Sequence, residues 1–475
     1  MTEPAVHPRP AGAAVSQPYP RRWLALYVLV LARVMDLFDG AVTSVAGPSI
    51  QASFGSGYAE LQWFSAAYTL ALGAGLIAGA RLGDRFGRRR VLLTAVAGFT
   101  AASALCGLAP SAGALIAFRL LQGGFAAMMV PQQLGLVKTM FAPHELPKVF
   151  GVLGPAIGLA TVAAPLLGGL LLQADLFGTG WRAVFLVNLP AGVVLFAGTR
   201  ALVAESRSPR PQRLDVLGIG LLAASAVLVL LPLVQGRELG WPPWMFGVLA
   251  AAAPVLLLFL RHERRVQARG GSPVVVPGLL RTRSFLAGLA MAGVFYAAVQ
   301  GFMLVLMLYL QVGLGRSPMA AGSVLIAWSA GAAISSTVAG LYLVRRFGRR
   351  GLHAGLAVMA ASYTAIALVP APTEVSLAPL LFVAGIGMGL VLAPFLSIVL
   401  WGVDNHEIGS ASGLLNTAQQ LAGALGVAVL GSVFLALGGD GGLAAAFRPV
   451  CWLVAGLLTV SFALAFFLPK AKVVK

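Results

Sequence analysis

The chain has 475 residues, of which 59% are hydrophobic and only 10% are charged, and its mean hydropathy is +0.90. Soluble globular domains average about a quarter charged residues, so this composition excludes a water-soluble enzyme and indicates a protein made of membrane-spanning helices. The formal net charge of +18 would also fit a nucleic-acid-binding protein, so the positions of the basic residues have to be considered.

Apolar stretches of about 20 residues, the length that crosses a hydrocarbon core as an α-helix, recur from Trp23 almost to the end of the chain. We predict an all-α polytopic membrane protein with fourteen spanning helices. The predicted spans are 23–43, 60–80, 91–108, 113–136, 150–172, 183–203, 215–234, 245–260, 285–308, 319–341, 352–370, 377–400, 410–435 and 449–468. The seventh and eighth spans are short, so twelve helices and a re-entrant hairpin remain the alternative.

The 33 Lys and Arg residues fall in alternate loops. The two tails and every second loop hold 27 of them, the intervening loops hold four, and two lie inside helices. Cytoplasmic loops of membrane proteins carry an excess of Lys and Arg, so both termini are predicted to be cytoplasmic in a multi-pass protein of the cell membrane. The basic charge therefore reflects membrane topology, and we expect no nucleic-acid partner.

Cysteine and histidine spacing gives no sign of a metal or redox site. Cys106 and Cys451 lie in separate apolar helices, and the five histidines lack the spacing of metal ligands. The sequence also has no GxxxxGK phosphate-binding loop and no nucleophile–base constellation. We therefore expect no metal, no cofactor and no enzymatic activity.

An internal repeat divides the chain. The segment GARLGDRFGRR at 79–89 returns as GLYLVRRFGRR at 340–350, with the same Phe-Gly-Arg-Arg core. Many secondary transporters consist of two such halves, with the substrate between them near mid-membrane. The predicted parts are a cytoplasmic tail (1–22), a six-helix bundle (23–203), a linker with two inserted helices (204–284), a second six-helix bundle (285–469) and a cytoplasmic tail (470–475).

The segment 80–92, ARLGDRFGRRRVL, resembles the cytoplasmic signature between helices 2 and 3 of the major facilitator superfamily. In that family the loop is a charged latch between conformations. The resemblance gives the latch role to Asp84, Arg85, Arg88 and Arg89, with Gly87 permitting a tight turn. The second copy has Arg345 in place of Asp84, so the two latches are not electrostatically equivalent.

The first helix contains LFDGAVTSVAGP at 37–48, which resembles the helix 1 signature of the fourteen-helix drug:proton antiporter branch, with Asp39 at its acidic position. An unpaired carboxylate inside a membrane costs several kcal/mol, so Asp36 and Asp39 are functional candidates. Arg33 and Asp36 would neutralise each other near the inner surface. We therefore expect Asp39 to be the main proton carrier, while Asp36 remains the alternative.

Two further segments carry the resemblance. RLLQGGFAAMMVPQQ at 119–133 resembles the signature with a buried arginine, so Arg119 is expected to relay protons and organise the site. The predicted fifth helix resembles the antiporter signature of exporters, which indicates export over import. Its interruptions, expected to permit a bend and close helix contact, are Pro155, Pro165, Gly168 and Gly169.

Polar and aromatic residues on three predicted helices are candidates for the substrate cavity. They are Trp63, Tyr68, Tyr296, Gln300, Asn416, Gln419 and Gln420. Aromatic residues in membrane helices also serve in packing or at the lipid interface, and that interpretation competes for the first three.

Together these features predict a proton-driven secondary exporter of drugs, antibiotics or other small lipophilic compounds, including cationic ones, that works by alternating access. Its expected partners are the small-molecule substrate, protons and the lipid bilayer, and a monomer is expected to suffice. The alternative is a dedicated exporter of an endogenous metabolite, a self-made antibiotic or a lipid. A symporter that imports a nutrient ranks third.

Overall fold

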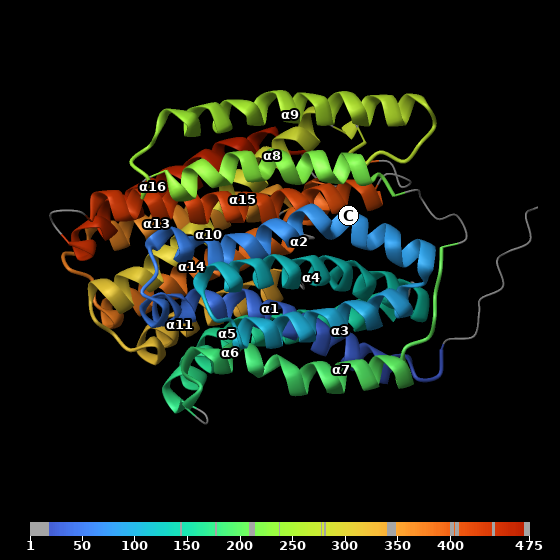
Figure 1. Ribbon diagram of the computed structural model, residues 1–475, viewed down its shortest axis with the longest axis horizontal. Coiled ribbons are helices and arrows are strands. Elements are labelled where there is room, and N and C mark those ends of the chain that lie inside the picture. The colour runs from blue at the N-terminus through green and yellow to red at the C-terminus, as the bar shows by residue number, and fades with distance from the viewer. Residues whose placement is uncertain are drawn as a thin grey trace, which may run out of the picture.

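The protein is helical throughout the residues that the computed structural model describes (Figure 1). These residues are 19–142, 145–175, 178–208, 214–236, 238–276, 278–279, 282–339, 348–399, 403, 408–438 and 442–469. Each of the fourteen predicted spans overlaps a helix in this part of the chain, while residues 340, 341 and 400 of the tenth and twelfth spans lie outside the described residues.

The first group of helices comprises α1 (Arg22–Phe54), α2 (Tyr58–Phe86), α3 (Arg88–Gly107), α4 (Ala112–Met140), α5 (Leu146–Ala174), the 3₁₀ turn η3 (Gly180–Arg182), α6 (Ala183–Leu186) and α7 (Asn188–Leu202). The next two are α8 (Val216–Gln235) and α9 (Pro243–Ala268). The last group comprises α10 (Arg283–Leu308), the π-helical turn η5 (Tyr309–Gly313), α11 (Pro318–Val338), α13 (Arg349–Leu368), α14 (Glu374–Val399), α15 (Ile408–Leu437), α16 (Leu443–Leu464) and η7 (Ala465–Phe467).

Membrane-spanning character extends over both groups. Among the described residues, twelve helical stretches are long and apolar enough to cross a membrane, and α8 and α9 are two of them. Helices α1 and α5, with 33 and 29 residues, also have the necessary length. The sixth span was predicted as one helix over 183–203. The structure differs in detail, because the helix is interrupted at Val187, between α6 and α7.

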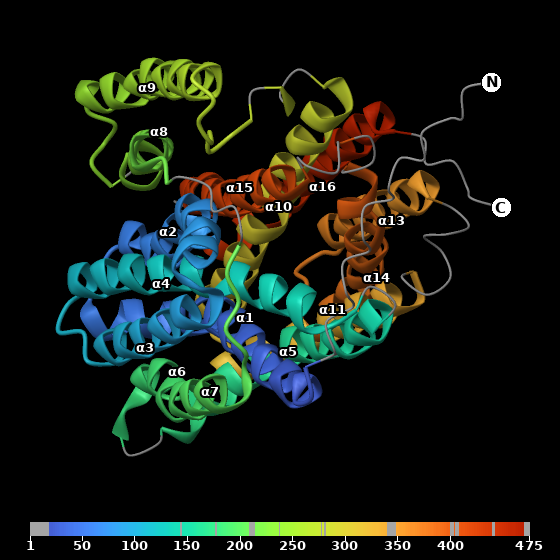
Figure 2. The same ribbon diagram turned by 90° about the vertical axis from the view of Figure 1, so that its right-hand side faces the viewer.

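The two groups lie side by side and meet where α2 packs on α15 and α5 packs on α11 (Figure 2). Helices α8 and α9 lie together at the edge of the bundle, where α8 contacts both α2 and α15. This arrangement places α2 at a junction, because it contacts α4 of its own group, α15 of the other group and α8.

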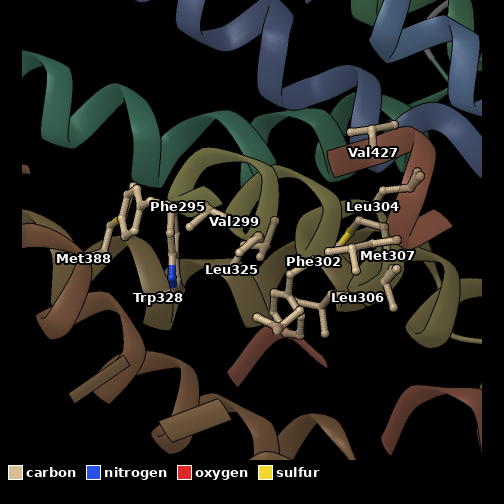
Figure 3. Close-up of a cluster of buried hydrophobic side chains, with 14 of the residues drawn as sticks. Phe295, Val299, Phe302, Leu304, Leu306, Met307, Leu325, Trp328, Met388 and Val427 are labelled. Carbon is tan, nitrogen blue, oxygen red and sulfur yellow. The ribbon is translucent and has the colours of Figure 1, made fainter. Parts of the chain in front are cut away.

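The largest apolar cluster is centred on α10 (Figure 3). Phe295, Phe302 and Met307 of this helix are buried, and they pack with Trp328 of α11 and Met388 of α14. The second half is therefore organised around one apolar helix.

Close helix contacts depend on glycine. A Cβ added to Gly123 of α4 would clash with the backbone carbonyl oxygen of Tyr68 in α2, and one on Gly79 of α2 would clash with that of Ala127 in α4. Helix association in lipid relies on such small residues, because lipid tails provide no hydrophobic driving force between helices. The glycines thus set how closely α2 approaches α4.

Hydrogen bonds attach the α8–α9 pair and the segment after it to α2 near both ends of that helix. Near the start of α2, Glu238, in the turn between α8 and α9, accepts a hydrogen bond of 2.7 Å from the backbone N–H of Ala59. Near the end of α2, Arg81 donates to the carbonyl oxygen of Pro273, just beyond α9. The α8–α9 pair is therefore connected to both ends of α2.

We expect Gly123→Ala to lower the thermal midpoint of the purified protein, because the added Cβ has to displace the backbone of α2, at a cost of about 1–3 kcal/mol. Gly124→Ala is the matched control, because nothing lies within 4 Å of its Cβ position. The measurement is thermal unfolding in detergent. Equal midpoints for the two variants would contradict the role assigned to this contact.

Candidate functional site

The central feature is an ion pair inside the first group of helices. Asp39 lies near the middle of α1, and its carboxylate accepts a hydrogen bond from the Arg119 guanidinium of α4. Their side chains are 0% and 1% exposed. The sequence predicted both as site residues, and the structure brings them into direct contact.

Two amides complete the shell around Asp39. Its Oδ1 accepts from Gln122 Nε2 at 2.8 Å and from Asn188 Nδ2 at 3.0 Å. The Asn188 side-chain amide also donates to Ser103 Oγ at 2.9 Å, and that hydroxyl donates to the carbonyl oxygen of Phe185. The Asp39 carboxylate therefore has three donors from two helices other than its own.

Arg119 is also saturated with partners. Its Nε donates to the carbonyl oxygen of Phe64 at 3.0 Å, and Nη1 donates to Gln122 Oε1 at 2.7 Å as well as to Asp39. Its guanidinium lies 4.3 Å from the centre of the Tyr68 ring, which is within cation–π range. A guanidinium stays charged in proteins, so removing Asp39 would leave an uncompensated buried cation.

A second ion pair, formed by Arg33 and Asp36, adjoins the first. Asp36 Oδ2 accepts from Arg33 at 2.8 Å, and Asp36 Oδ1 accepts from the Tyr68 hydroxyl at 2.7 Å. Arg33 is 31% exposed, whereas the Asp36 side chain is only 6% exposed. The expected neutralisation of Asp36 by Arg33 is thus seen, and Tyr68 connects this partly exposed pair with the sealed pair of Asp39 and Arg119.

The predicted latch loop is held by several contacts, within the loop and with the segment that follows α7. Asp84 and Arg88 form an ion pair of 2.7 Å, and Arg88 also donates to Ser206 Oγ at 3.2 Å. Gly87 has a φ of +105°, which disfavours any residue with a side chain, and a Cβ there would lie 2.7 Å from Glu205. Gly87 therefore makes the tight turn that the sequence predicted.

The other two latch arginines differ in exposure, because Arg85 is exposed and Arg89 is half-buried. The guanidinium of Arg85 lies 5.2 Å from the ring of Phe86. The backbone N–H of Arg89 donates to Glu205 at 3.1 Å, and its side chain donates to the carbonyl oxygen of Arg200. Residues 340–347 of the second copy, including Arg345, lie outside the described residues.

The glycines of the predicted exporter signature lie at helix contacts. A Cβ on Gly168 would lie 2.5 Å from the side chain of Val42 in α1, and one on Gly169 would lie 2.7 Å from the backbone of Met319 in α11. The side chains of Pro155 and Pro165 are outside the described structure, although the backbone of α5 is helical through both. The bend stays a prediction.

The candidate cavity residues divide into two sets, one on α2 and one on α10 and α15. In the first set, Tyr68 belongs to the charged network, whereas Trp63 is buried in an apolar cluster with residues of α8 and α15. Trp63 therefore agrees with the packing interpretation of the aromatic candidates. Gln300 and Asn416 are exposed, and Tyr296, Gln419 and Gln420 are half-buried. Gln420 lies against Gly73 of α2 at the junction of the two halves. The structure does not bring the second set into contact with Asp39.

Sequence reasoning assigned no role to Gln122, Asn188 or Ser103. Gln122 lies three residues after Arg119, on the same face of the helix, and a lone Asn in the apolar segment FLVNLP is conspicuous. Both positions could therefore have been noticed in the sequence. The sequence did not show that Gln122 and Asn188 share Asp39 as a partner, because this depends on how α7 packs against α1.

Comparison with known proteins identifies the family. The model of the Major Facilitator Superfamily matches residues 29–214 and 191–427. The chain therefore belongs to the major facilitator superfamily, whose members are membrane transporters. The fold agrees, because a bacterial homologue of the human lysosomal transporter Spinster, solved in an inward-facing occupied conformation, has a TM-score of 0.67 at 18% identity and covers 95% of this chain and 97% of its own.

Three curated relatives come from Streptomyces. A probable actinorhodin transporter of S. coelicolor is 45% identical over 91% of this chain and 76% of its own. A puromycin resistance protein of S. alboniger is 37% identical over 89% and 83%, and a tetracenomycin C resistance and export protein of S. glaucescens is 32% identical over 91% and 80%. These similarities cover nearly the whole chain.

We expect Asp39→Asn and Arg119→Gln each to destabilise the protein by about 3–5 kcal/mol, because either change leaves one buried charge without its partner. The double variant should lose much less than the sum, because both charges are gone. Thermal unfolding of the four proteins measures this coupling. The surface pair of Arg316 and Glu374 is the control, expected to couple by at most about 1 kcal/mol. Additive losses at the buried pair would contradict the assignment.

Proposed function

We propose that this member of the major facilitator superfamily is a proton-driven exporter of antibiotics or other small lipophilic compounds that works by alternating access. The observation that carries the proposal is the sealed ion pair of Asp39 and Arg119 in the middle of the first half. A charged pair inside a membrane is costly to maintain, which makes it a candidate functional site.

For the topology, we propose fourteen spanning helices, with α8 and α9 inserted between six-helix halves at 23–203 and 285–469. The length of α1 and α5, added to the twelve apolar stretches, supports this count. In the same proposal, residues 204–284 are the linker that contains the two inserted helices. The tails 1–22 and 470–475 are both cytoplasmic. The monomer is the working unit. The alternation of basic loops supports this orientation.

Asp39 is the proposed main proton carrier, and Arg119 controls it. The Asp39 carboxylate is surrounded by three donors, so under this proposal proton uptake there requires the Arg119 contact to open. Asp36 is the proposed site of proton exchange with the cavity, because its partner Arg33 is partly exposed and its other partner, Tyr68, packs on Arg119. Each proton entering with the membrane potential provides about 2.3 kcal/mol per 100 mV.

The direction of transport is proposed to be outward. The three Streptomyces relatives are named for the transport of, or the resistance to or export of, antibiotics. A dedicated exporter of one self-made antibiotic is the second candidate. It is favoured by the 45% identity to a probable actinorhodin transporter, a higher value than the 32% to a multidrug resistance protein of Mycobacterium tuberculosis.

The decisive experiment uses inside-out vesicles with an established pH gradient. We expect ethidium, puromycin or tetracenomycin C to dissipate the gradient with the parent protein, and Asp39→Asn to abolish the response, because an amide cannot take up the proton. Glu374→Gln is the control, since this acid pairs with Arg316 away from the network and should leave the response intact.

Each other outcome has a distinct meaning. A response that survives Asp39→Asn and is lost in Asp36→Asn would move the proton site to Asp36. A response that survives in both would contradict the proposed coupling residues. Response to a single antibiotic would select the dedicated exporter over the broad one.

The latch gives a second prediction. We expect Asp84→Asn to slow substrate-driven proton movement about fivefold, because loss of its ion pair with Arg88 shifts the balance between conformations by about 1 kcal/mol. Binding of ethidium, measured by fluorescence, should change little. Arg90→Gln is the control, because Arg90 is largely exposed and lies 3.8 Å from Glu205. Equal rates for the two variants would contradict the latch role.

A further inference from the structure

A compact polar cluster lies at the inner ends of the inserted helices. Asp215 caps the first turn of α8, where its Oδ1 accepts from the backbone N–H of Gly218 at 2.9 Å. His262 lies near the end of α9, and its Nε2 is 2.8 and 3.0 Å from the two Asp215 oxygens. The next residue, Glu263, turns its Oε2 to the backbone N–H of Val275 at 2.7 Å.

The other oxygen of Glu263 has no hydrogen-bond partner. The residue is only 1% exposed, so Oε1 is removed from bulk water without compensation. A buried acceptor left in this way is destabilising, and more so if it is charged. One ligand atom each from Asp215, His262 and Glu263 lies within 4.8 Å of the others. The unpartnered oxygen is therefore part of a convergent donor set.

Gly218 lets both carboxylates approach the start of α8 closely. A Cβ at this position would lie 2.5 Å from Glu263 Oε1 and 2.7 Å from Asp215 Oδ2. Both carboxylate oxygens therefore face the same small residue, beside the imidazole that contacts Asp215.

The charge of the cluster favours a cation. Among the described residues, the carboxyl groups of Asp215 and Glu263 face the guanidinium of Arg81, which donates to the carbonyl oxygen of Pro273 and acts electrostatically on both acids. Divalent cations are bound by such sets of imidazole and carboxylate, in which the acids supply the charge and the imidazole supplies a nitrogen donor.

We infer that Asp215, His262 and Glu263 form a divalent-cation site of the zinc type at the inner end of α8 and α9. One imidazole nitrogen and two carboxylate oxygens are a three-ligand set that leaves a fourth position for water. Ca²⁺ takes six to eight oxygen ligands and Mg²⁺ prefers six, so three ligands with one nitrogen favour Zn²⁺.

The site is separate from the transport machinery proposed above. It lies on the inserted helices and contains neither Asp39 nor the latch acid Asp84. A bound ion would join the start of α8 to the end of α9, and through Glu263 it would hold the segment at Val275 that leads into α10. The inference stands or falls independently of proton coupling.

Metal binding by the full-length protein tests the inference. The tag-free protein in lipid nanodiscs would be titrated with Zn²⁺ at neutral pH by calorimetry, with Mg²⁺ as the comparison. We expect one Zn²⁺ per chain, no saturable Mg²⁺ binding and a higher thermal midpoint with Zn²⁺. Asp215→Asn, His262→Gln and Glu263→Gln should each weaken Zn²⁺ binding at least tenfold.

His353→Gln is the matched control, because this histidine lies on α13, outside the cluster, and its substitution should leave Zn²⁺ binding unchanged. Absence of stoichiometric Zn²⁺ binding by the parent, or binding retained in all three cluster variants, would overturn the inference. If a variant fails to fold, X-ray absorption of the Zn²⁺-loaded parent decides. One imidazole and two or more oxygens support the site, and a spectrum without imidazole refutes it.

Discussion

The buried contact between Arg119 and Asp39 is the constraint on which the first half depends. An always-charged guanidinium in a lipid-embedded bundle has to be neutralised and hydrogen-bonded, and three helices contribute to this. α1 provides Asp39, α4 provides Gln122, and α2 provides the Phe64 carbonyl oxygen. The close approach of α2 to α4 that their glycines permit makes the Phe64 contact possible, so the packing and the charged site have one structural cause.

The two halves share a fold but differ in their interiors. The charged residues buried in the described part of the chain all precede α10, whereas the second half is centred on the apolar cluster around Phe302. At the position that the repeat offset pairs with Asp39, the second half has Gln300, which is neutral and exposed. Under the proposed function, the first half therefore responds to protons, and the second half supplies the surface against which it moves.

The sequence predicted the elements well because hydrophobic length alone identifies helices in a membrane protein. It also selected Asp39, Arg119 and Asp36, because a charge inside an apolar span stands out in one dimension. It did not predict the shell around them. Asn188 reaches Asp39 across 149 residues of sequence, from the start of α7, and Asp215 meets His262 across 47. Such contacts depend on how helices pack, which hydrophobic length does not specify.

A carboxylate with three donors links proton uptake to movement. Under the proposed mechanism, protonating Asp39 removes the charge that holds Arg119, which still has the Phe64 carbonyl, Gln122 and the face of Tyr68 as partners. Phe64 and Tyr68 both belong to α2, so a shift of the Arg119 side chain would act directly on this helix. This helix carries Tyr68 near its middle and Asp84 of the proposed latch near its C-terminal end, and it packs on α15 of the other half. One helix thus connects the proton site, the latch and the junction between the halves, so proton uptake at Asp39 would reach the second half through α2.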